Sequence, residues 1–288
     1  MSLLQSAAFL RCYGLLPHRL LNGAVAHMAR ARRPRWAVDT AIRLWIRRAR
    51  IDMNDFEERS YSCVEDFFLR RLRPGARQLA EGFVSPVDGR VVGAGVIESD
   101  TVLHVKGRPI SVARLVNGRR HDIPLRDYEG GMYAVIFLSP HGYHRAHMPV
   151  DGQLVGCYWV PGRYFPQNEA ALRHISGVYE RNERAILRCR MDNGPEFLLV
   201  MIGASLVGGI FLEGISRATW VRPEPVALSQ RRVKGEEIGH FTFGSTVAVL
   251  VPRGSVRCLI PEVGADAHLG EALFELVGGG LRFQNVLP

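Results

Sequence analysis

The chain has 288 residues, of which 47% are hydrophobic and 23% are charged, and its formal net charge is +9. This composition is typical of a globular protein rather than a disordered or fibrous one. No charge-free apolar stretch approaches the ~18 residues that a spanning helix needs, which excludes an integral membrane protein. The five cysteines are scattered and include no Cys-x-x-Cys pair. They therefore argue against a disulfide scaffold or a structural zinc site and favour a reducing compartment.

The first 50 residues hold all of the excess charge. They contain ten arginines and one acidic residue, Asp39, whereas the rest of the chain has 27 basic and 27 acidic side chains. An enzyme that acts on nucleic acid more often spreads its basic residues over the folded surface. We therefore expect no nucleic-acid partner.

Residues 36–48 have the periodicity of an amphipathic helix. The apolar positions and the charged positions fall on opposite sides: Val38, Ala41, Ile42 and Trp45 against Asp39, Arg43, Arg47 and Arg50. An arginine face combined with tryptophan suits an anionic bilayer surface, where each arginine contributes on the order of 1 kcal/mol. This pattern predicts that residues 1–50 are a basic, amphipathic membrane-docking segment.

Two other interpretations of this segment stay open. A helix that packs against its own domain and leaves its arginines in solvent would show the same pattern. A mitochondrial targeting sequence is also arginine-rich and acid-poor, but Ser2 and Ser6 are the only serines in these 50 residues. A secretory signal is disfavoured because no apolar region follows a basic start.

The rest of the chain changes from helical to strand-like patterns. Residues 54–73 mix acidic residues with phenylalanines and are predicted to be helical until Pro74-Gly75 ends them. From residue 83 onward, short β-branched runs alternate with glycine and proline, at 90–97, 132–138, 197–202, 206–212 and 246–251. Few regular helices separate these runs, so βαβ winding is disfavoured. We predict an α+β fold with a β-rich, mostly antiparallel, barrel- or sandwich-like domain over residues 51–288, preceded by N-terminal amphipathic helices.

Two motifs in this domain contain side chains suited to acid–base chemistry. Ser85-Pro-Val-Asp-Gly-Arg90 places an Asp-Gly pair between apolar runs, which by itself is typical of a hairpin turn. Ser139-Pro-His-Gly-Tyr-His-Arg-Ala-His-Met-Pro149 has three histidines at steps of three. Such a cluster favours acid–base work, with a structural role as the alternative. Zinc is disfavoured because this spacing is not an established ligand pattern, so no metal site is predicted.

A third motif, Gly239-His-Phe-Thr-Phe-Gly-Ser-Thr-Val247, places Gly-Ser-Thr just before an apolar strand. It lacks the G-x-S-x-G setting of a hydrolase nucleophile, and by itself it is typical of a bend. Aspartate, histidine and serine in one chain nevertheless permit an activated serine.

Taken together, the three motifs closely resemble those of the pyruvoyl-dependent phosphatidylserine decarboxylase family. The P-x-D-G turn, the Y-H-R-x-H-x-P segment and the L-G-S-T self-cleavage site of that family are matched by Pro86-Val-Asp-Gly89, Tyr143-His-Arg-Ala-His-Met-Pro149 and Phe243-Gly-Ser-Thr246. Supporting matches such as Phe67-Phe-Leu-Arg-Arg71 keep family order and spacing over roughly residues 35–275. Phe243 in place of leucine is the one departure at the cleavage site.

The resemblance implies a proenzyme that cuts itself between Gly244 and Ser245 into a large chain (1–244) and a small chain (245–288). The Ser245 hydroxyl would attack the Gly244 carbonyl in an N→O acyl shift, and elimination and hydrolysis would leave a pyruvoyl group derived from Ser245. This covalent cofactor would form a Schiff base with phosphatidylserine, release CO₂ and give phosphatidylethanolamine. By match to the family, His147 is the base for cleavage, Asp88 orients it, and His144 handles a proton during decarboxylation. The residues themselves do not separate His144 from His147.

The implied substrate is an anionic lipid that stays in the bilayer, and a docking segment of charge +9 would concentrate the enzyme there. We therefore expect a peripheral protein on the cytoplasmic face of the inner membrane, with residues 51–288 as the catalytic domain. Its expected partners are phosphatidylserine and the large and small chains of one precursor, and a homodimer stays open. Two rival functions are a serine hydrolase acting on lipids and a non-catalytic, membrane-docked β-domain. Both rivals predict an intact chain.

Overall fold

The computed structural model describes residues 18–98, 102–117, 123–192, 194–205, 209–222, 224–242, 245–259 and 262–277. Its helices are α2 (His18–Ala29), α3 (Arg35–Ala49), α4 (Val64–Phe68), α5 (Val112–Leu115), α6 (Glu169–His174), α7 (Val178–Arg181) and α8 (Arg217–Trp220), with one 3₁₀ turn, η3 (Leu125–Tyr128). Its strands are β1 (Phe83–Val84), β2 (Gly89–Val96), β3 (Val102–Val105), β4 (Arg108–Ser111), β5 (Met132–Leu138), β6 (Arg145–His147), β7 (Gly152–Val160), β8 (Arg184–Met191), β9 (Glu196–Gly203), β10 (Gly209–Leu212), β11 (Val226–Arg232), β12 (Glu237–Thr242), β13 (Ser245–Val251), β14 (Val256–Cys258), β15 (Asp266–Ala267) and β16 (Ala272–Leu276).

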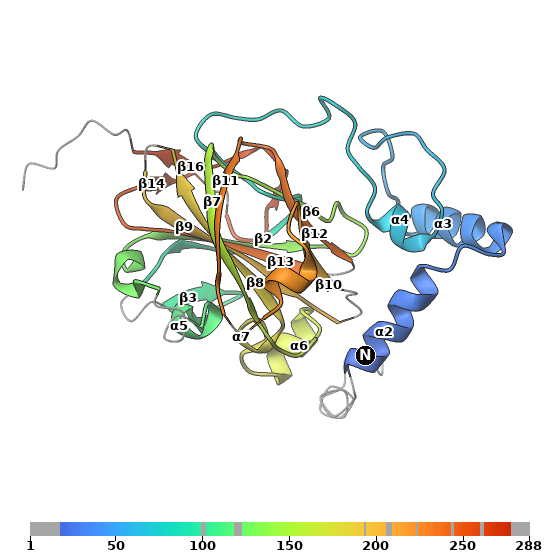
Figure 1. The fold of residues 1–288 in the computed structure, drawn as a ribbon, viewed down its shortest axis with the longest axis horizontal. Coiled ribbons are helices and arrows are strands. Elements are labelled where there is room, and N and C mark those ends of the chain that lie inside the picture. The colour runs from blue at the N-terminus through green and yellow to red at the C-terminus, as the bar shows by residue number, and fades with distance from the viewer. Residues whose placement is uncertain are drawn as a thin grey trace, which may run out of the picture.

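The centre of the molecule is an eight-stranded antiparallel sheet in the order β11-β7-β8-β9-β13-β5-β2-β15 (Figure 1). Strand β13 lies in the middle of this sheet, between β9 and β5, and all seven of its residues are buried. Apolar residues on both faces of a strand indicate a sheet that is covered on both sides. Within the described residues the sheet is open, with β11 and β15 as its edges, so the sandwich-like form of the predicted α+β fold is confirmed and no closed barrel forms.

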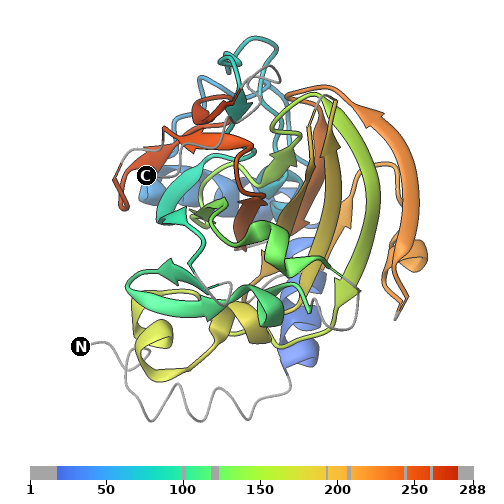
Figure 2. The same cartoon turned by 90° about the vertical axis from the view of Figure 1, so that its left-hand side faces the viewer.

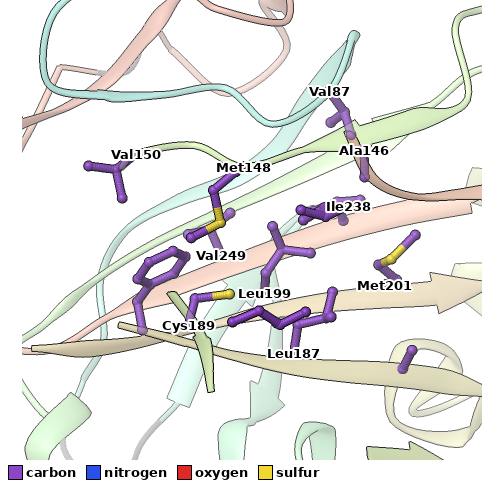
Figure 3. Packing of buried hydrophobic residues seen from close by; sticks show 14 of the residues in the cluster. Val87, Ala146, Met148, Val150, Leu187, Cys189, Leu199, Met201, Ile238 and Val249 are labelled. Atoms are coloured by element: carbon purple, nitrogen blue, oxygen red, sulfur yellow. The ribbon is translucent and has the colours of Figure 1, made fainter. Parts of the chain in front are cut away.

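A second, three-stranded sheet in the order β10-β12-β6 packs against one face of the large sheet. Residues of β6, β10 and β12 and their flanks share one hydrophobic cluster with residues of β8, β9 and β13 (Figure 3). Ala146, Met148 and Ile238 meet Leu199 and Val249 in this layer. We call this cluster the inter-sheet core. Strand β13 contributes side chains to this core, and its first residue, Ser245, is on the same face of the strand.

The other face of the large sheet is covered by the β3–β4 hairpin and the short helices α5, α6 and α7 (Figure 2). Leu103, Leu115 and Leu172 from these elements pack on Val200 and Ala248 of the sheet. Odd-numbered residues of β13 therefore face the inter-sheet core, and even-numbered residues face this second layer, as strand geometry requires.

The predicted helix over residues 36–48 is present as α3, but its apolar stripe is covered by the chain itself. Val38 and Ile42 are buried against Tyr61 and Phe67, and Trp45 packs beside them. No helix within the described residues is both long and apolar enough to cross a membrane.

The prediction of a continuous helix over residues 54–73 was wrong, because only Val64–Phe68 is helical. Instead, the two ends of the segment pair with each other. The Glu57 N–H donates to the Arg71 carbonyl at 3.0 Å and the Arg73 N–H donates to the Asp55 carbonyl at 2.9 Å. This tertiary pairing satisfies backbone groups that a helix would have bonded locally, and it therefore overrides the local helical pattern.

Candidate active site

Ser245 is the first residue of the central strand β13. It is paired with Leu138 of β5 on one side and Gly203 of β9 on the other, and it is fully buried. Strand alternation directs its side chain to the same face as Val247 and Val249, which lie in the inter-sheet core. Its Oγ atom has no hydrogen-bond partner among the described residues. Phe243 and Gly244, the residues before the predicted cleavage point, lie outside the described residues.

His144 is held at the same end of β13 by two separate connections. Strand β5 ends at Leu138, the partner of Ser245, and a tight turn with a Gly142 N–H to Ser139 carbonyl bond then leads to His144. From the other side, the Phe241 N–H donates to the His144 carbonyl at 3.0 Å, and Phe241 lies in β12, four residues before Ser245. Residue 144 therefore lies beside the strand ends that flank the predicted cleavage site.

The hydrogen bonds of the His144 ring fix which nitrogen carries the proton. Nδ1 lies 3.1 Å from the Gly142 carbonyl oxygen, which can only accept, so Nδ1 is the protonated nitrogen of the neutral ring. Nε2 is then left with a free lone pair. This atom is buried and has no partner among the described residues. Buried polar atoms without partners are uncommon, although the described residues contain others, among them the indole nitrogens of Trp159 and Trp220.

Burial also keeps the His144 ring neutral. Removal from water lowers the pKa of His144 to about 3, the bond to Gly142 opposes this effect, and the nearby charge of Arg70 adds to it. The Phe68 ring covers the imidazole, with 3.9 Å between ring centroids. At neutral pH, His144 therefore offers an unprotonated nitrogen in a water-poor setting.

His147 lies on the other side of β6. Ala146 and Met148 point into the inter-sheet core, so alternation turns His147 away from it and groups His144 with Ala146. The His147 Nδ1 donates to the Gly235 carbonyl at 2.8 Å, and the Tyr143 hydroxyl donates to Nε2 at 2.9 Å. Burial lowers the pKa of His147, so this ring is neutral as well, but both of its nitrogens are occupied.

Asp88, in the loop before β2, is bound to groups other than histidine. Its Oδ1 accepts the Leu269 N–H at 2.7 Å, and its Oδ2 accepts from Nη2 of Arg77 at 2.6 Å. No hydrogen bond joins Asp88 to His147 within the described residues. The two side chains line adjoining cavities of about 550 and 280 Å³, and both cavities are lined by Arg77 and Tyr143.

The structure thus brings Ser245 and His144 to one end of β13, and it places Asp88 and His147 around neighbouring cavities. The side chains that contact the two histidines and Asp88 were not identified from the sequence. Tyr143 and Arg70 lie inside motifs that were quoted, Tyr143-His-Arg and Phe67-Phe-Leu-Arg, so those motifs carried a usable signal. Arg77 follows Pro74-Gly75 in a stretch with no pattern and could be found only from the fold.

The clustered histidines do not converge on a metal position. The His144 and His147 rings bond through Nδ1 to different carbonyls, those of Gly142 and Gly235. Among the described residues, one group could offer three ligand atoms within 4.8 Å of one another: Glu213, Glu237 and His240. Glu237 already forms an ion pair with Arg145, with 2.6 Å between Nη1 and Oε1.

Comparison with known proteins identifies relatives over most of the chain. A family model described as phosphatidylserine decarboxylase matches residues 64–275. A phosphatidylserine decarboxylase proenzyme of Polaromonas naphthalenivorans is 36% identical over 286 residues, which cover 93% of this chain and 96% of the relative. A proenzyme of the same name from Methylibium petroleiphilum is 39% identical over 275 residues, covering 90% and 94%. One from Brevibacillus brevis is 35% identical over 244 residues, covering 81% and 86%.

Proposed function

The chain belongs to the phosphatidylserine decarboxylase family, and from that premise we propose that it cleaves itself between Gly244 and Ser245 and then decarboxylates phosphatidylserine to phosphatidylethanolamine. The observation that carries this proposal is the pair of buried atoms without partners at one end of β13: Oγ of Ser245 and Nε2 of His144. Leaving a buried hydroxyl or ring nitrogen unbonded costs roughly 1–3 kcal/mol. Two such atoms at the same end of β13 are consistent with a reaction at that place.

The position of Ser245 fits a pyruvoyl group. Such a group supplies a carbonyl that takes up electrons as a carboxylate leaves, the chemistry for which many enzymes bind pyridoxal phosphate. Residue 245 is fixed by strand pairing on both sides, to Leu138 and Gly203, and it is fully buried. The inter-sheet core and Phe68 keep bulk water away, and His144 can hold or release a proton at Nε2.

For maturation we propose that His147 takes the Ser245 proton and that Asp88 supports it. The Oγ–carbonyl bond to Gly244 forms as the peptide C–N bond breaks, and the proton taken from Oγ passes to the freed amine of Ser245. Elimination of the resulting ester then separates the chains, and hydrolysis of the dehydroalanine releases ammonia and leaves the pyruvoyl group. In the described contacts, Nε2 of His147 is bound to the Tyr143 hydroxyl and Asp88 is bound to Arg77. A direct role of His147 therefore requires Nε2 to leave the Tyr143 hydroxyl and the ring to reach the face of β6 toward which Ser245 points.

The test of this function is the state of the purified chain together with its turnover. We expect two chains of residues 1–244 and 245–288, with a carbonyl-reactive terminus on the smaller one, and release of CO₂ from phosphatidylserine in mixed micelles. Denaturing electrophoresis, intact mass and CO₂ release measure these three results. A single uncut chain that is inactivated by a serine-directed reagent would favour a serine hydrolase instead.

We further expect that the two chains stay together after cleavage. Strand β13 of the small chain is buried between β5 and β9 of the large chain, and β16 pairs with β1. Because these ladders do not depend on the cut peptide bond, native mass spectrometry should show one particle containing both chains. The chains should separate only in denaturant. Elution of the large chain without the small chain under native conditions would contradict this expectation.

We propose that α2 and α3 dock the enzyme on the anionic cytoplasmic face of the inner membrane. The buried stripe of α3 is used for packing, so the docking surface is the exposed one, which carries Trp36, Arg43, Leu44, Arg47 and Arg48. The Trp36 side chain is 72% exposed, which is unusual for a residue of this size unless it meets a partner. Tryptophan and arginine together suit the headgroup region of a bilayer.

This docking surface can be tested without removing the helix. Replacing Arg43, Arg47 and Arg48 by Gln should weaken binding to phosphatidylglycerol-containing vesicles on the order of a hundredfold, at about 1 kcal/mol per arginine. Binding of the unaltered protein should also weaken with salt. Vesicle co-sedimentation measures both effects.

The matched control removes three exposed arginines far from α3, in β4, η3 and β14: Arg108, Arg126 and Arg257. This variant has the same net charge, and it should bind vesicles as the unaltered protein does. Equal loss in both triple variants would mean that total charge, rather than this surface, governs binding.

A further inference from the structure

Arg70 is a buried cation that lacks the partner expected for one. Its side chain is 1% exposed, and within the described residues no carboxylate forms an ion pair with it. Its guanidinium lies over the rings of Phe56 and Phe67, at 4.3 and 5.0 Å from their centroids. A charge removed from water without a counter-ion is costly, and burial accordingly lowers the pKa of Arg70 to about 10. Arg70 is still protonated at neutral pH.

Arg70 donates from Nη1 to the Phe67 carbonyl at 3.4 Å, and its other two hydrogen bonds lead toward His144. Nη2 donates to the His141 carbonyl at 2.6 Å and to the Gly142 carbonyl at 2.9 Å. The Gly142 oxygen is the same atom that accepts the proton of His144 Nδ1 at 3.1 Å. One carbonyl oxygen therefore joins the guanidinium to the imidazole.

Neighbours of Arg70 in sequence hold the same segment from other sides. The Phe68 ring covers His144, and the Leu69 carbonyl accepts from Nη2 of Arg145 at 2.6 Å. Thus Phe68 contacts the His144 ring directly, and Arg70 reaches it through the Gly142 carbonyl. Leu69 binds Arg145, the residue that follows His144. A helix end that only filled space would not need a charge at the centre of this contact.

We propose that Arg70 is a positioning residue for the chemistry at Ser245: by fixing the Gly142 carbonyl it holds His144 as the Nδ1-protonated tautomer, with Nε2 free to exchange a proton. The catalytic importance of Arg70 rests on the proposed function. Its effect on the His144 tautomer can be measured without any turnover. The charge contributes in a second way. Of the titratable groups near His144, Arg70 and His141 are the two that oppose its protonation.

The test uses full-length protein with Arg70→Gln and Arg70→Lys. Arg70→Gln removes the charge and the forked donor, and we expect turnover per cleaved molecule to fall 10–100-fold with KM changed less than threefold. Arg70→Lys restores a cation and one donor and should recover part of that loss. Thermal melting and the cleaved fraction show how much of each variant is folded and mature.

A second readout reports the tautomer itself. In protein labelled with ¹⁵N-histidine, the ring signals of His144, assigned by their loss in His144→Ala, should show one Nδ1-protonated tautomer. In folded Arg70→Gln they should show a mixture of tautomers. This measurement stays informative even if no decarboxylation is found, so failure of the proposed function and failure of the inference are distinguishable.

The matched control is Arg59→Gln. Arg59 also supports α4, through a 2.7 Å ion pair with Asp66, but it does not contact residues 141–144. It should keep normal turnover and an unchanged His144 tautomer. If Arg70→Gln loses activity only in proportion to its folded, cleaved fraction and keeps a single tautomer, Arg70 serves packing alone and the inference is overturned.

Discussion

Ser245→Ala is expected to yield one uncut chain of 32.2 kDa with no decarboxylase activity. Alanine lacks the oxygen that must attack the Gly244 carbonyl, and it cannot become a pyruvoyl group, so both the cut and the cofactor are lost together. The fold should survive, because the removed Oγ makes no hydrogen bond within the described residues and the position is enclosed by apolar neighbours. Removing a buried hydroxyl that lacks a partner can even be neutral or stabilising.

Two companion variants make this result specific. Ser245→Cys should still cleave at least in part, because a thiol can make the same acyl shift. Ser255→Ala, in the turn after β13, should cleave and turn over normally. Intact mass of each denatured protein identifies the chains, with the small chain at roughly 5 kDa by proportion of length. Cleavage of Ser245→Ala between residues 244 and 245 would refute the assigned nucleophile.

The sequence was sufficient to predict several of the strands and to name candidate reacting residues, which stay a prediction, but it did not identify the side chains that contact those residues. Runs such as 132–138 and 246–251 became β5 and β13 because short, continuous runs of β-branched and apolar residues bounded by turn residues favour buried strands. The pairing of Ser245 with Leu138 and Gly203 depends on contacts between distant segments, which no local pattern encodes. For the same reason the bond between Asp88 and Arg77 could not be anticipated, whereas the Asp-Gly turn could.

The helix over residues 36–48 illustrates the limit of an amphipathic pattern. Periodicity correctly placed the apolar residues on one face, but it does not say whether that face meets lipid or protein. The structure places Val38 and Ile42 against Tyr61 and Phe67, which leaves the arginine face and Trp36 exposed. Deleting residues 1–50 would therefore uncover Phe67, next to the Phe68 ring that covers His144. Substitution of exposed arginines is the cleaner experiment.

Replacing His144 and His147 separately should divide the two reactions. His144→Ala removes the unpartnered Nε2 at the Ser245 end of β13, and turnover per cleaved molecule should fall by the ~10²–10⁴-fold typical of losing a general acid–base group. Cleavage needs to happen only once per chain, so a slowed cut can still accumulate during expression, whereas every turnover has the full penalty. His147→Ala and Asp88→Ala should instead leave mostly uncut chain, since the Ser245 hydroxyl then lacks its proposed base or the support of that base.

The measurement is the ratio of cut to uncut chain for each variant, followed by CO₂ release per cut molecule. His174→Ala, an exposed histidine on α6, serves as the control and should match the unaltered protein in both quantities. His144 is bonded only through Nδ1, whereas both nitrogens of His147 are bonded. The hydrogen bonds are therefore also compatible with the reversed roles, and the same measurement tests them. If His144→Ala stays uncut and His147→Ala matures normally, then His144, the histidine grouped with Ser245 by strand alternation, is the base for cleavage, and the assignment of the two histidines is reversed.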